Sequence, residues 1–595
     1  MRPHVLIVHH ACKYDGHFFV PVGSTRCVLV KRTGAQIVWE CLLREGVTDV
    51  FGYPGGAILP VYDAMIDYPI RHVLVRHEQG ATHMADGYAR ASGRVGVALA
   101  TSGPGATNMV TGIAAAMMDS SPIVCITGQV SSHLLGTDAF QETDITSITQ
   151  AITKHNWLVT RPEDVEPTLR AAFAIAQSGR PGPVLVDITK DAQQGSCEFD
   201  PPVESAGASD ATDASGIEGL EEAITLINAA ERPVILAGHG IILGGAEDEL
   251  HAFAHKAQIP IAVTLLGIGA VPSSDPLSLG MMGLHGEAWV NHAIQEADLL
   301  IALGMRFDDR VTGDPKQYAR AARKIHVDID PAEINKIIPV DVGIAGNAGS
   351  VIRGWLPHVD RKDRTPWLRQ IAEVRSESAA LDIQHLPDDG NLYAAHVIKD
   401  LSRVTGGQAL VVTDVGQHQM WEAQYYQHET RRSLVTSGGC GAMGFALPAA
   451  IGAKIACPER EVWVVVGDGG FQMTMAELAT IVQENIDINI AIINNGYLGM
   501  VRQLQHHFYD RRYVAVPLSG PDFVTLAQAY GLWSRAVDRR SDVVGTIAAA
   551  RAHRGTSLID FRVEQEDLVY PNVRPGAALH EMIRRPSALV ETAAN

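Results

Sequence analysis

The stretch from residue 461 to residue 499 constrains the fold most, because it has the pattern of a complete strand–helix–strand unit. An apolar run at 462–466 is typical of a buried parallel strand, and it leads into a glycine-rich turn at 467–470. A helical pattern follows, and a second apolar run at 488–493 ends in two asparagines. A right-handed crossover brings both strand ends to the same edge of a parallel sheet.

Asp468 and Asn495 follow these two strands, so we expect them to lie side by side where α/β sheets bind ligands. A carboxylate, an amide oxygen and nearby backbone carbonyls suit Mg²⁺ that carries a substrate diphosphate. The alternative is an Asp that caps a helix and an Asn that ends a strand. The occurrence of both in one unit favours the metal site. The arrangement resembles the diphosphate-anchoring motif of thiamine-diphosphate enzymes.

Chain length and strand spacing predict three α/β domains, each a doubly wound parallel sheet. The chain has 595 residues, 46% of them hydrophobic and 56 of them glycine, and domains average about 150–200 residues. Strands alternate with helices along most of it. We predict domains at 31–191, 217–356 and 381–582, linkers at 192–216 and 357–380, an unassigned extension at 1–30 and a tail at 583–595.

The charge and the cysteines limit the partners and the compartment. A net charge of −19 argues against nucleic acid and anionic membranes, which need basic patches. No apolar run approaches a membrane span, and residues 1–30 lack the order of a signal peptide. The seven cysteines are scattered without a C-x-x-C spacing, which predicts reduced thiols in a cytoplasmic protein.

Glu78 is the candidate for a second part of the site. It follows a predicted strand at 72–76, and the H-E-x-x-H zinc motif is excluded because position 81 is Ala81. A helix N-terminal acid is the structural alternative. Thiamine-diphosphate enzymes use a glutamate from a domain other than the one that holds the diphosphate. It hydrogen-bonds the aminopyrimidine, and RHEQGA at 76–81 matches its motif.

Six further strings narrow the resemblance. They are GYPGGA at 52–57, TSGPGATN at 101–108, GTDAFQE at 136–142, RFDDR at 306–310, VGQHQMW at 415–421 and NGYLGMVRQ at 495–503. Together they resemble the catalytic subunit of acetohydroxyacid synthase, also called acetolactate synthase, from about residue 31 to about residue 582. The resemblance implies a pyrimidine-binding, a central FAD-binding and a diphosphate-binding domain. It also implies decarboxylation of pyruvate and ligation to a second 2-ketoacid, pyruvate or 2-ketobutyrate. The products would be 2-acetolactate or 2-aceto-2-hydroxybutyrate, for branched-chain amino acid synthesis.

Site residues carry over by position. The Mg²⁺ ligands would be Asp468, Asn495 and the carbonyl of Tyr497. Thiamine diphosphate would contact Gly56, Glu78, Val415, Gly416, Gln417, His418, Gly441, Met443, Gly467, Gly469 and Gly470. Catalytic roles would fall to Glu78, Gln141, Lys190 and Arg310, and the substrate pocket to Phe140, Leu284, Met500, Val501 and Leu504.

The flavin would be structural, since the net reaction transfers no electrons. Gly238 to Gly240 form a glycine turn after a strand, where a diphosphate can approach backbone amides. The positions that match family FAD contacts are Arg180, Gly238, His239, Gly240, Thr264, Leu265, Leu284, His285, Arg306, Asp308, Arg310 and Asp328.

Two positions have a more specific reading. Arg310 can hold a ketoacid carboxylate through its planar guanidinium, and the alternative is a salt bridge to Asp308 or Asp309. Leu504 stands where the family usually has Trp. Because that Trp favours 2-ketobutyrate, we predict a weak preference for it here, with about 1–3 kcal/mol of discrimination lost. Leu284 replaces a common Met at similar volume.

Two other functions stay open. One is a different three-domain thiamine enzyme, such as a pyruvate oxidase, a sulfoacetaldehyde acetyltransferase or a flavin-free acetolactate synthase. The other is a non-catalytic paralogue, against which the intact Glu78, Asp468 and Asn495 argue. Because Glu78 and the metal site fall in separate domains, we expect a homodimer or tetramer. A small regulatory subunit is usual in bacterial members of the family.

Overall fold

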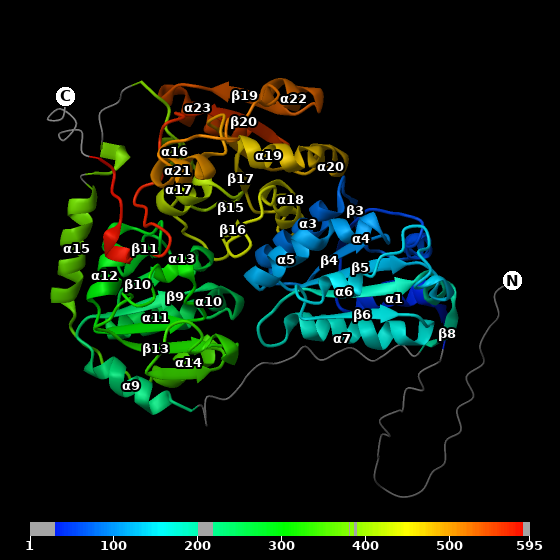
Figure 1. The fold of residues 1–595 in the computed structure, drawn as a ribbon, viewed down its shortest axis with the longest axis horizontal. Helices are drawn as coiled ribbons and strands as arrows, with labels where there is room; N and C mark the ends of the chain where they lie inside the picture. The colour runs from blue at the N-terminus through cyan, green and yellow to red at the C-terminus, as the bar shows by residue number, and fades with distance from the viewer. Residues whose placement is uncertain (1–29, 200–217, 380, 386–389, 587–595) are drawn as a thin grey trace, which may run out of the picture.

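The computed structural model describes residues 30–199, 218–379, 381–385 and 390–586. They form three α/β domains in chain order, coloured blue to cyan, green, and yellow to red in Figure 1. Each domain has a six-stranded sheet in which every pairing is parallel. The predicted fold class is therefore confirmed. Of the extension predicted at 1–30, residues 1–29 lie outside the described residues.

The N-terminal sheet has the order β3-β2-β4-β5-β7-β6. Its strands are β2 (Asp49–Gly52), β3 (Arg71–Leu74), β4 (Gly96–Ala100), β5 (Ile123–Gln129), β6 (His155–Val159) and β7 (Val184–Thr189). The larger helices are α1 (Gly34–Arg44), α3 (Glu78–Ser92), α5 (Val110–Asp119) and α7 (Val165–Gln177).

The central sheet has the order β11-β10-β9-β12-β13-β14. Its strands are β9 (Pro233–Ala237), β10 (Ile261–Val263), β11 (Ser278–Met281), β12 (Leu299–Leu303), β13 (Arg323–Asp328) and β14 (Val342–Ala345). Its helices include α9 (Leu220–Ala229), α10 (His239–Leu243), α11 (Glu247–Ala257), α12 (Ala288–Glu296), α14 (Ala348–Trp355) and α15 (Thr365–Ala379).

The third sheet has the order β16-β15-β17-β18-β20-β19. Its strands are β15 (Leu410–Thr413), β16 (Leu434–Thr436), β17 (Val462–Gly467), β18 (Asn489–Asn494), β19 (Trp533–Val537) and β20 (Ser557–Arg562). Helices include α16 (Ala394–Thr405), α17 (Gln417–Tyr425), α18 (Ala446–Ala456), α19 (Asp468–Thr474), α20 (Leu478–Glu484), α21 (Gly499–Phe508), α22 (Phe523–Ala529) and α23 (Arg540–Ala552).

Each sheet has a point where the chain turns from building one side of the sheet to building the other, and such a point opens a ligand crevice at the carboxyl ends of the strands. This reversal point lies between β2 and β4 in the first sheet, between β9 and β12 in the second, and between β15 and β17 in the third.

Helix α3 of the N-terminal domain packs against helix α18 of the third domain, and the two lie side by side in Figure 1. A Cβ atom added to Gly87 of α3 would lie 2.0 Å from the carbonyl oxygen of Ala449 in α18. One added to Gly452 of α18 would lie 1.9 Å from the carbonyl oxygen of Met84. Glycine at these positions lets the two helix backbones pack directly together.

Parts of the predicted linkers and tail are ordered. Residues 190–199 form α8 (Lys190–Gln194) and β8 (Ser196–Phe199), and β8 pairs antiparallel with β1 (Val30–Thr33). The linker prediction for 192–199 was therefore wrong. The linker predicted at 357–380 contains α15, because Trp367 and Ile371 bury one face of that helix in the central core. In the predicted tail, Ile583 pairs with Asn572.

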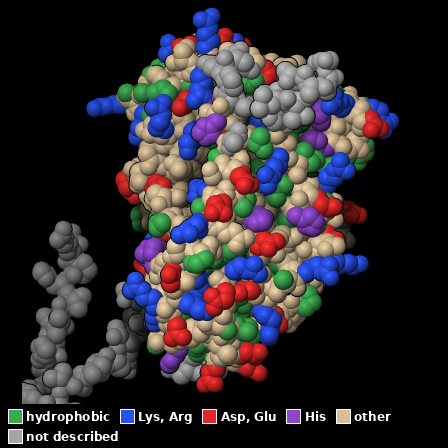
Figure 2. Space-filling model, turned by 90° about the vertical axis from the view of Figure 1, so that its left-hand side faces the viewer, with side chains coloured by type: hydrophobic (Ala, Val, Ile, Leu, Met, Phe, Trp, Pro, Cys, Tyr) green, Lys and Arg blue, Asp and Glu red, His purple; other side chains and the backbone are tan. Residues whose placement is uncertain are grey.

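The surface carries both charges, as Figure 2 shows for the face that includes the central domain, where basic and acidic side chains are interspersed. None of the helices in the described ranges is long and apolar enough to cross a membrane.

Candidate active site

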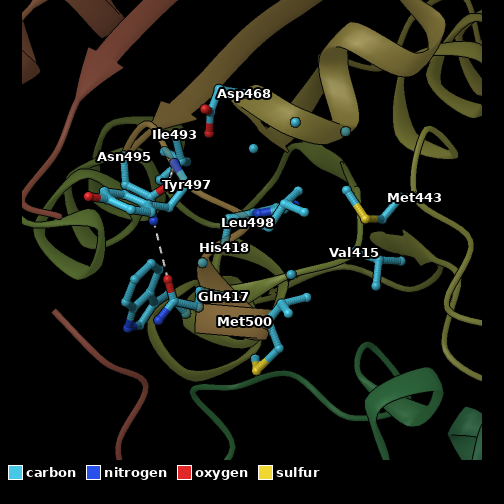
Figure 3. Close-up of a pocket in the computed structure, with 17 residues that line it drawn as sticks. Val415, Gln417, His418, Met443, Asp468, Ile493, Asn495, Tyr497, Leu498 and Met500 are labelled. Atoms are coloured by element: carbon cyan, nitrogen blue, oxygen red, sulfur yellow. Dashed lines mark hydrogen bonds between the residues drawn. The ribbon is translucent and has the colours of Figure 1, made fainter. Parts of the chain in front are cut away.

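A pocket opens at the reversal point of the third sheet, where β15, β17 and β18 end (Figure 3). Every residue that lines it falls between positions 415 and 501. The lining contains Val415, Gly416, Gln417, His418, Trp421, Met443, Gly467, Asp468, Gly469, Gly470, Ile493, Asn495, Tyr497, Leu498, Gly499, Met500 and Val501.

The three predicted Mg²⁺ ligands all line this pocket, because β17 and β18 are paired neighbours. Asp468 is the first residue of α19, and Asn495 comes directly after β18. The backbone N–H of Tyr497 donates to Asn495 Oδ1 over 3.1 Å, which ties the turn after β18 to the asparagine. The prediction that Asp468 and Asn495 lie together is confirmed.

The donor set of the pocket fits a hard divalent cation. Asp468 is only 4% exposed, and burial raises the pKa of its carboxyl group to about 6. A buried carboxylate in this state is costly without a nearby cation. Carboxylate, amide and carbonyl oxygens are the ligands that Mg²⁺ prefers. The residues present therefore fit Mg²⁺.

An amide network holds the Asn495 side chain. Asn495 Nδ2 donates to Gln417 Oε1 over 3.3 Å, the bond drawn as a dashed line in Figure 3. Gln417 Nε2 in turn donates to Gln503 Oε1 over 2.9 Å and to the carbonyl oxygen of Asp567 over 3.2 Å. With its amide nitrogen bound in this way, Asn495 keeps its oxygen toward the Tyr497 turn.

Glycines bring the backbone close to the pocket. A Cβ atom on Gly470 would lie 2.2 Å from Asp414 Oδ1, and one on Gly499 would lie 2.1 Å from Gln417 Oε1. A side chain at either position would displace the buried Asp414 or Gln417 side chain. Glycine backbone beside a pocket at a helix N-terminus is typical of diphosphate sites.

His418 lines the pocket and has one ring nitrogen without a hydrogen-bond partner among the described residues. Burial lowers the pKa of His418 to about 3, so its imidazole is neutral. Its Nε2 atom is buried and has no hydrogen-bond partner within the described part of the chain. Because a buried polar atom without a partner is costly, the pocket geometry is that of a site completed by a ligand.

Most of the predicted third-domain contacts line the pocket. They are Val415, Gly416, Gln417, His418, Met443, Gly467, Gly469, Gly470, Met500 and Val501. Gly441 does not line it and is exposed with a φ of 66°. Trp421, Ile493, Leu498 and Gly499 were not predicted as contacts, although Trp421 ends the VGQHQMW string and the other three flank Asn495.

Glu78 does not line this pocket. It begins α3 and is 9% exposed, and its Oε2 atom accepts from Asn108 Nδ2 over 2.9 Å. The preceding backbone N–H groups of Arg76 and His77 donate to Glu477 Oε1, over 3.0 and 3.2 Å. Glu477 ends η7 (Met475–Glu477), the turn after α19, whereas the pocket residue Asp468 begins α19. Within one chain, Glu78 therefore lies near the Glu477 end of residues 468–477, whereas the predicted metal ligand Asp468 lies at the other end.

The remaining candidates from the N-terminal domain, two catalytic, one substrate-binding and one cofactor-binding, are also outside the pocket lining. Phe140 is 88% exposed, and Gln141 next to it has a left-handed backbone with a φ of 61°. Lys190 begins α8 at the carboxyl end of β7. Gly56 is exposed after β2. None of these residues lines the pocket of its own chain.

The other substrate-binding candidates differ in location: one is on the surface, one is near the pocket and one is in the central core. The Arg310 guanidinium is 64% exposed, with Nε 3.3 Å from Asp309 Oδ2, so the alternative salt bridge is present. Leu504 is 37% exposed on α21, one turn beyond the pocket residue Met500. Leu284 is 3% exposed and packs in the central core, with its N–H bonded to the carbonyl oxygen of Arg310. Its side chain therefore does not line the pocket.

The predicted flavin contacts gather at the reversal point of the central sheet. Gly238 directly follows β9, and Gly304 directly follows β12. A Cβ atom on Gly240 would lie 2.6 Å from Gly304 Cα, and its N–H donates to Gly304 O over 2.9 Å. Thr264 follows β10, and Asp328 ends β13 with its pKa raised to about 6 by burial. Four neighbouring strands thus end beside a backbone that only glycine permits, which fits a dinucleotide.

The other predicted flavin contacts surround this edge less directly. Arg180 Nη1 lies 3.1 Å from Glu333 Oε1, and Arg306 Nη2 lies 3.4 Å from Asp308 Oδ2. His239 Nδ1 is 3.0 Å from the carbonyl oxygen of Asp119. Leu265 follows Thr264 and packs against the central core. Burial lowers the pKa of His285 to about 4.

Comparisons with known proteins agree in order and extent with these domains. Three models of the thiamine pyrophosphate enzymes match the chain: the N-terminal TPP binding domain at residues 32–148, the central domain at 220–354 and the C-terminal TPP binding domain at 414–561.

Similar full-length proteins come from several organisms. An acetolactate synthase of Mycobacterium bovis is 48% identical over 568 residues, or 93% of this chain and 92% of that protein. An acetolactate synthase large subunit of Corynebacterium glutamicum is 46% identical over 563 residues, 92% of this chain and 89% of that protein. An acetolactate synthase of Arthrospira platensis is 44% identical over 571 residues, 92% of this chain and 97% of that protein.

Proposed function

Because this chain belongs to the acetolactate synthase family of thiamine pyrophosphate enzymes, we propose that it decarboxylates pyruvate and joins the two-carbon unit to a second 2-ketoacid. With pyruvate or 2-ketobutyrate as acceptor, the products are 2-acetolactate or 2-aceto-2-hydroxybutyrate. The observation that carries this proposal is the pocket in which buried Asp468 and Asn495 meet beside glycine backbone.

In this proposal the third domain anchors the cofactor. Asp468, the Asn495 amide oxygen and the Tyr497 carbonyl hold Mg²⁺, and the backbone N–H groups around Gly469 and Gly470 face the diphosphate. Thiamine diphosphate, when bound, supplies the carbon nucleophile that protein side chains lack. The neutral His418 ring offers its buried Nε2 atom to the ligand without adding charge. Met443 would contribute an apolar contact from the side of the pocket opposite Asn495 and Tyr497 in Figure 3.

Glu78 of a second copy of the chain would complete the site. Its carboxylate would hydrogen-bond the aminopyrimidine and would hold the proton needed there. The position of Glu78 away from its own chain's pocket, and the exposure of Phe140, support a homodimer or a tetramer. One relative is named a large subunit, which supports a smaller regulatory chain as a further partner.

Arg310 would bind the carboxylate of the acceptor ketoacid. Its partner Asp309 is 72% exposed, and such surface pairs contribute only about 0–1 kcal/mol. A substrate carboxylate can therefore replace Asp309 as the partner of the guanidinium. Gln141 and Lys190 would lie along the substrate's approach from the adjoining subunit.

FAD would bind in the central domain, with its diphosphate near Gly238 and Gly240. The close approach of Gly240 to Gly304 supports this site. The flavin would act in assembly, since the reaction has no net electron transfer.

A colorimetric acetolactate assay with pyruvate, with thiamine diphosphate, Mg²⁺ and FAD omitted in turn, tests the proposal. We expect product only with thiamine diphosphate and Mg²⁺ present. Hydrogen peroxide without acetolactate would instead indicate an oxidase, and no turnover of pyruvate under any condition would indicate a non-catalytic paralogue.

A further inference from the structure

A cluster of metal-binding side chains lies in the central domain, away from the pocket. Among the residues that the structure describes, only His251, His255 and Asp275 form a group of three or more His, Cys, Asp or Glu with ligand atoms within 4.8 Å of one another. The histidines are four positions apart on α11, so they share one face of that helix. Asp275 faces them from the segment before β11.

The distances within the cluster match a tetrahedral metal. Asp275 Oδ2 lies 3.5 Å from His251 Nε2 and 2.9 Å from His255 Nε2. For metal–ligand bonds of about 2.0–2.1 Å, neighbouring ligands of a tetrahedral Zn²⁺ are about 3.3–3.4 Å apart. Small side-chain rotations would bring all three atoms to such a distance from a common centre.

The carboxylate is held in place by its own loop. Asp275 Oδ1 accepts the N–H of Leu277 over 2.8 Å and lies 3.2 Å from His255 Nε2, while Oδ2 faces both imidazoles. The Asp275 side chain is 6% exposed, whereas that of His251 is 56% exposed. The protein therefore closes one side of the cluster, and solvent has access to the other for a fourth ligand.

A structural hydrogen bond that attaches α11 to the loop before β11 does not explain the whole cluster. The contact between His255 and Asp275 alone would fasten α11 to the loop. His251 adds little to such an attachment, yet its Nε2 atom faces the same carboxylate oxygen, and its ring lies 4.2 Å from that of His255 at 32°. Two imidazole nitrogens directed at one carboxylate oxygen are typical of a metal site.

We propose that His251, His255 and Asp275 form a second metal site, which takes a borderline divalent transition metal such as Zn²⁺. Two nitrogens and one oxygen suit this class, whereas Mg²⁺ prefers the all-oxygen set at Asp468. The proposal does not depend on the catalytic function of the pocket.

The site would fasten a connection between domains. The residue two before Asp275, Ser273, donates its N–H to His428 O over 2.9 Å, and the N–H of His428 donates to Ser273 Oγ over 2.9 Å. His428 belongs to the third domain. A metal between α11 and this loop would therefore stabilise the packing of the central domain on the third domain.

Zinc binding to the full-length protein tests this site. Protein saturated with thiamine diphosphate, FAD and millimolar Mg²⁺ is loaded with Zn²⁺, desalted and analysed for bound metal by mass spectrometry. We expect His251→Ala to bind one equivalent of Zn²⁺ per chain less than the unaltered protein. Zn²⁺ should also raise the melting temperature of the unaltered protein more than that of the variant. Asp275→Asn should show the same loss of zinc.

His553→Ala is the matched control, since His553 is also an exposed histidine whose ring lies beside another ring, that of Trp533. It should bind as much zinc as the unaltered protein. The exposure of His251 means that its replacement leaves the fold intact. Equal zinc content in the unaltered protein and in His251→Ala would overturn the proposal, and so would a loss of zinc in His553→Ala as large as that in His251→Ala.

Discussion

Asp119 of the N-terminal domain accepts the backbone N–H of Gly439 in the third domain, with 2.6 Å between Oδ1 and the nitrogen. Asp119 Oδ2 accepts the N–H of Gly438 over 3.1 Å and the Arg90 guanidinium over 2.7 Å. Asp119 and Arg90 are both buried. This carboxylate therefore holds the start of the loop that carries Met443 into the pocket.

Replacing Asp119 with Asn should destabilise the protein by about 3 kcal/mol, the low end for breaking a buried ion pair, because Asp86 still faces Arg90. We also expect weaker binding of thiamine diphosphate, since the loop before Met443 loses its anchor. Thermal unfolding and a cofactor titration measure the two effects. Asp164→Asn, which breaks the exposed pair with Arg161, is the control and should leave both unchanged. An Asp119→Asn variant with normal cofactor affinity would contradict the anchoring role.

The contact between α3 and α18 predicts a strong effect of one methyl group. Gly87→Ala would place a Cβ atom 2.0 Å from a backbone oxygen of α18, and we expect a loss of more than about 3 kcal/mol. Gly545→Ala on α23 is the matched control, because its Cβ atom would have nothing within 4 Å. It should stabilise the chain by about 0.5–1 kcal/mol. Urea unfolding of both variants checks this, and equal effects would show that the close approach is unimportant.

The elements around the pocket were predictable because each has a local signal. Apolar runs followed by Gly467 or Asn494 mark the ends of β17 and β18, and neighbouring parallel strands bring those ends together. The helix in the predicted linker was missed because charge dominates residues 357–380, while Trp367 and Ile371, four positions apart, determine its packing.

Contacts between distant segments were not predictable from local pattern. Asp119 and Gly439 are each unremarkable in the sequence, and only the packing of two domains brings them together. Leu284 carried over as a pocket residue, but the turn that bonds it to Arg310 directs its side chain into the central core. Pattern thus indicates strand ends, whereas domain packing decides which side chains meet there.

Asp187 should make stability fall as pH rises toward neutrality. It is 1% exposed, and burial raises its pKa to about 7, against hydrogen bonds from Thr127 and Gln129. The pKa in the folded protein lies above the unfolded value of 3.8. The stability contributed by this proton is therefore fully present below pH 3.8 and is lost as the pH rises through about 7.

An Asp187→Asn variant cannot lose this proton. Between pH 5 and pH 7 its stability should rise relative to the unaltered protein by about 2–3 kcal/mol. Chemical unfolding of both proteins at several pH values measures the difference in their free energies of unfolding. Any effect of the amide that does not depend on pH cancels when the differences at two pH values are compared. A difference that does not change with pH would show that Asp187 is ionised throughout.

Leu504→Trp should shift acceptor choice toward 2-ketobutyrate. Leu504 lies one turn beyond Met500 on α21 and is partly exposed, so a larger ring has room to extend along the pocket mouth. An added apolar wall discriminates one methylene by about 1–3 kcal/mol, roughly tenfold or more in product ratio. Competition of the two ketoacids measures the ratio. Leu504→Ala adds no apolar wall and should keep the acceptor preference of the unaltered protein. A strong preference of the unaltered protein for 2-ketobutyrate would contradict this role of position 504.

Mixing two inactive variants tests whether one active site uses two chains. Glu78→Gln should abolish acetolactate formation while Asp468 and the pocket remain intact, and Asp468→Asn should abolish it while Glu78 remains. If Glu78 of one chain serves the pocket of the other, a mixed dimer has one site with both defects and one with neither. Random mixing in equal amounts then restores about a quarter of full activity. If each chain built its own site, every site in the mixture would carry one defect, and co-expression of the two variants would produce no acetolactate.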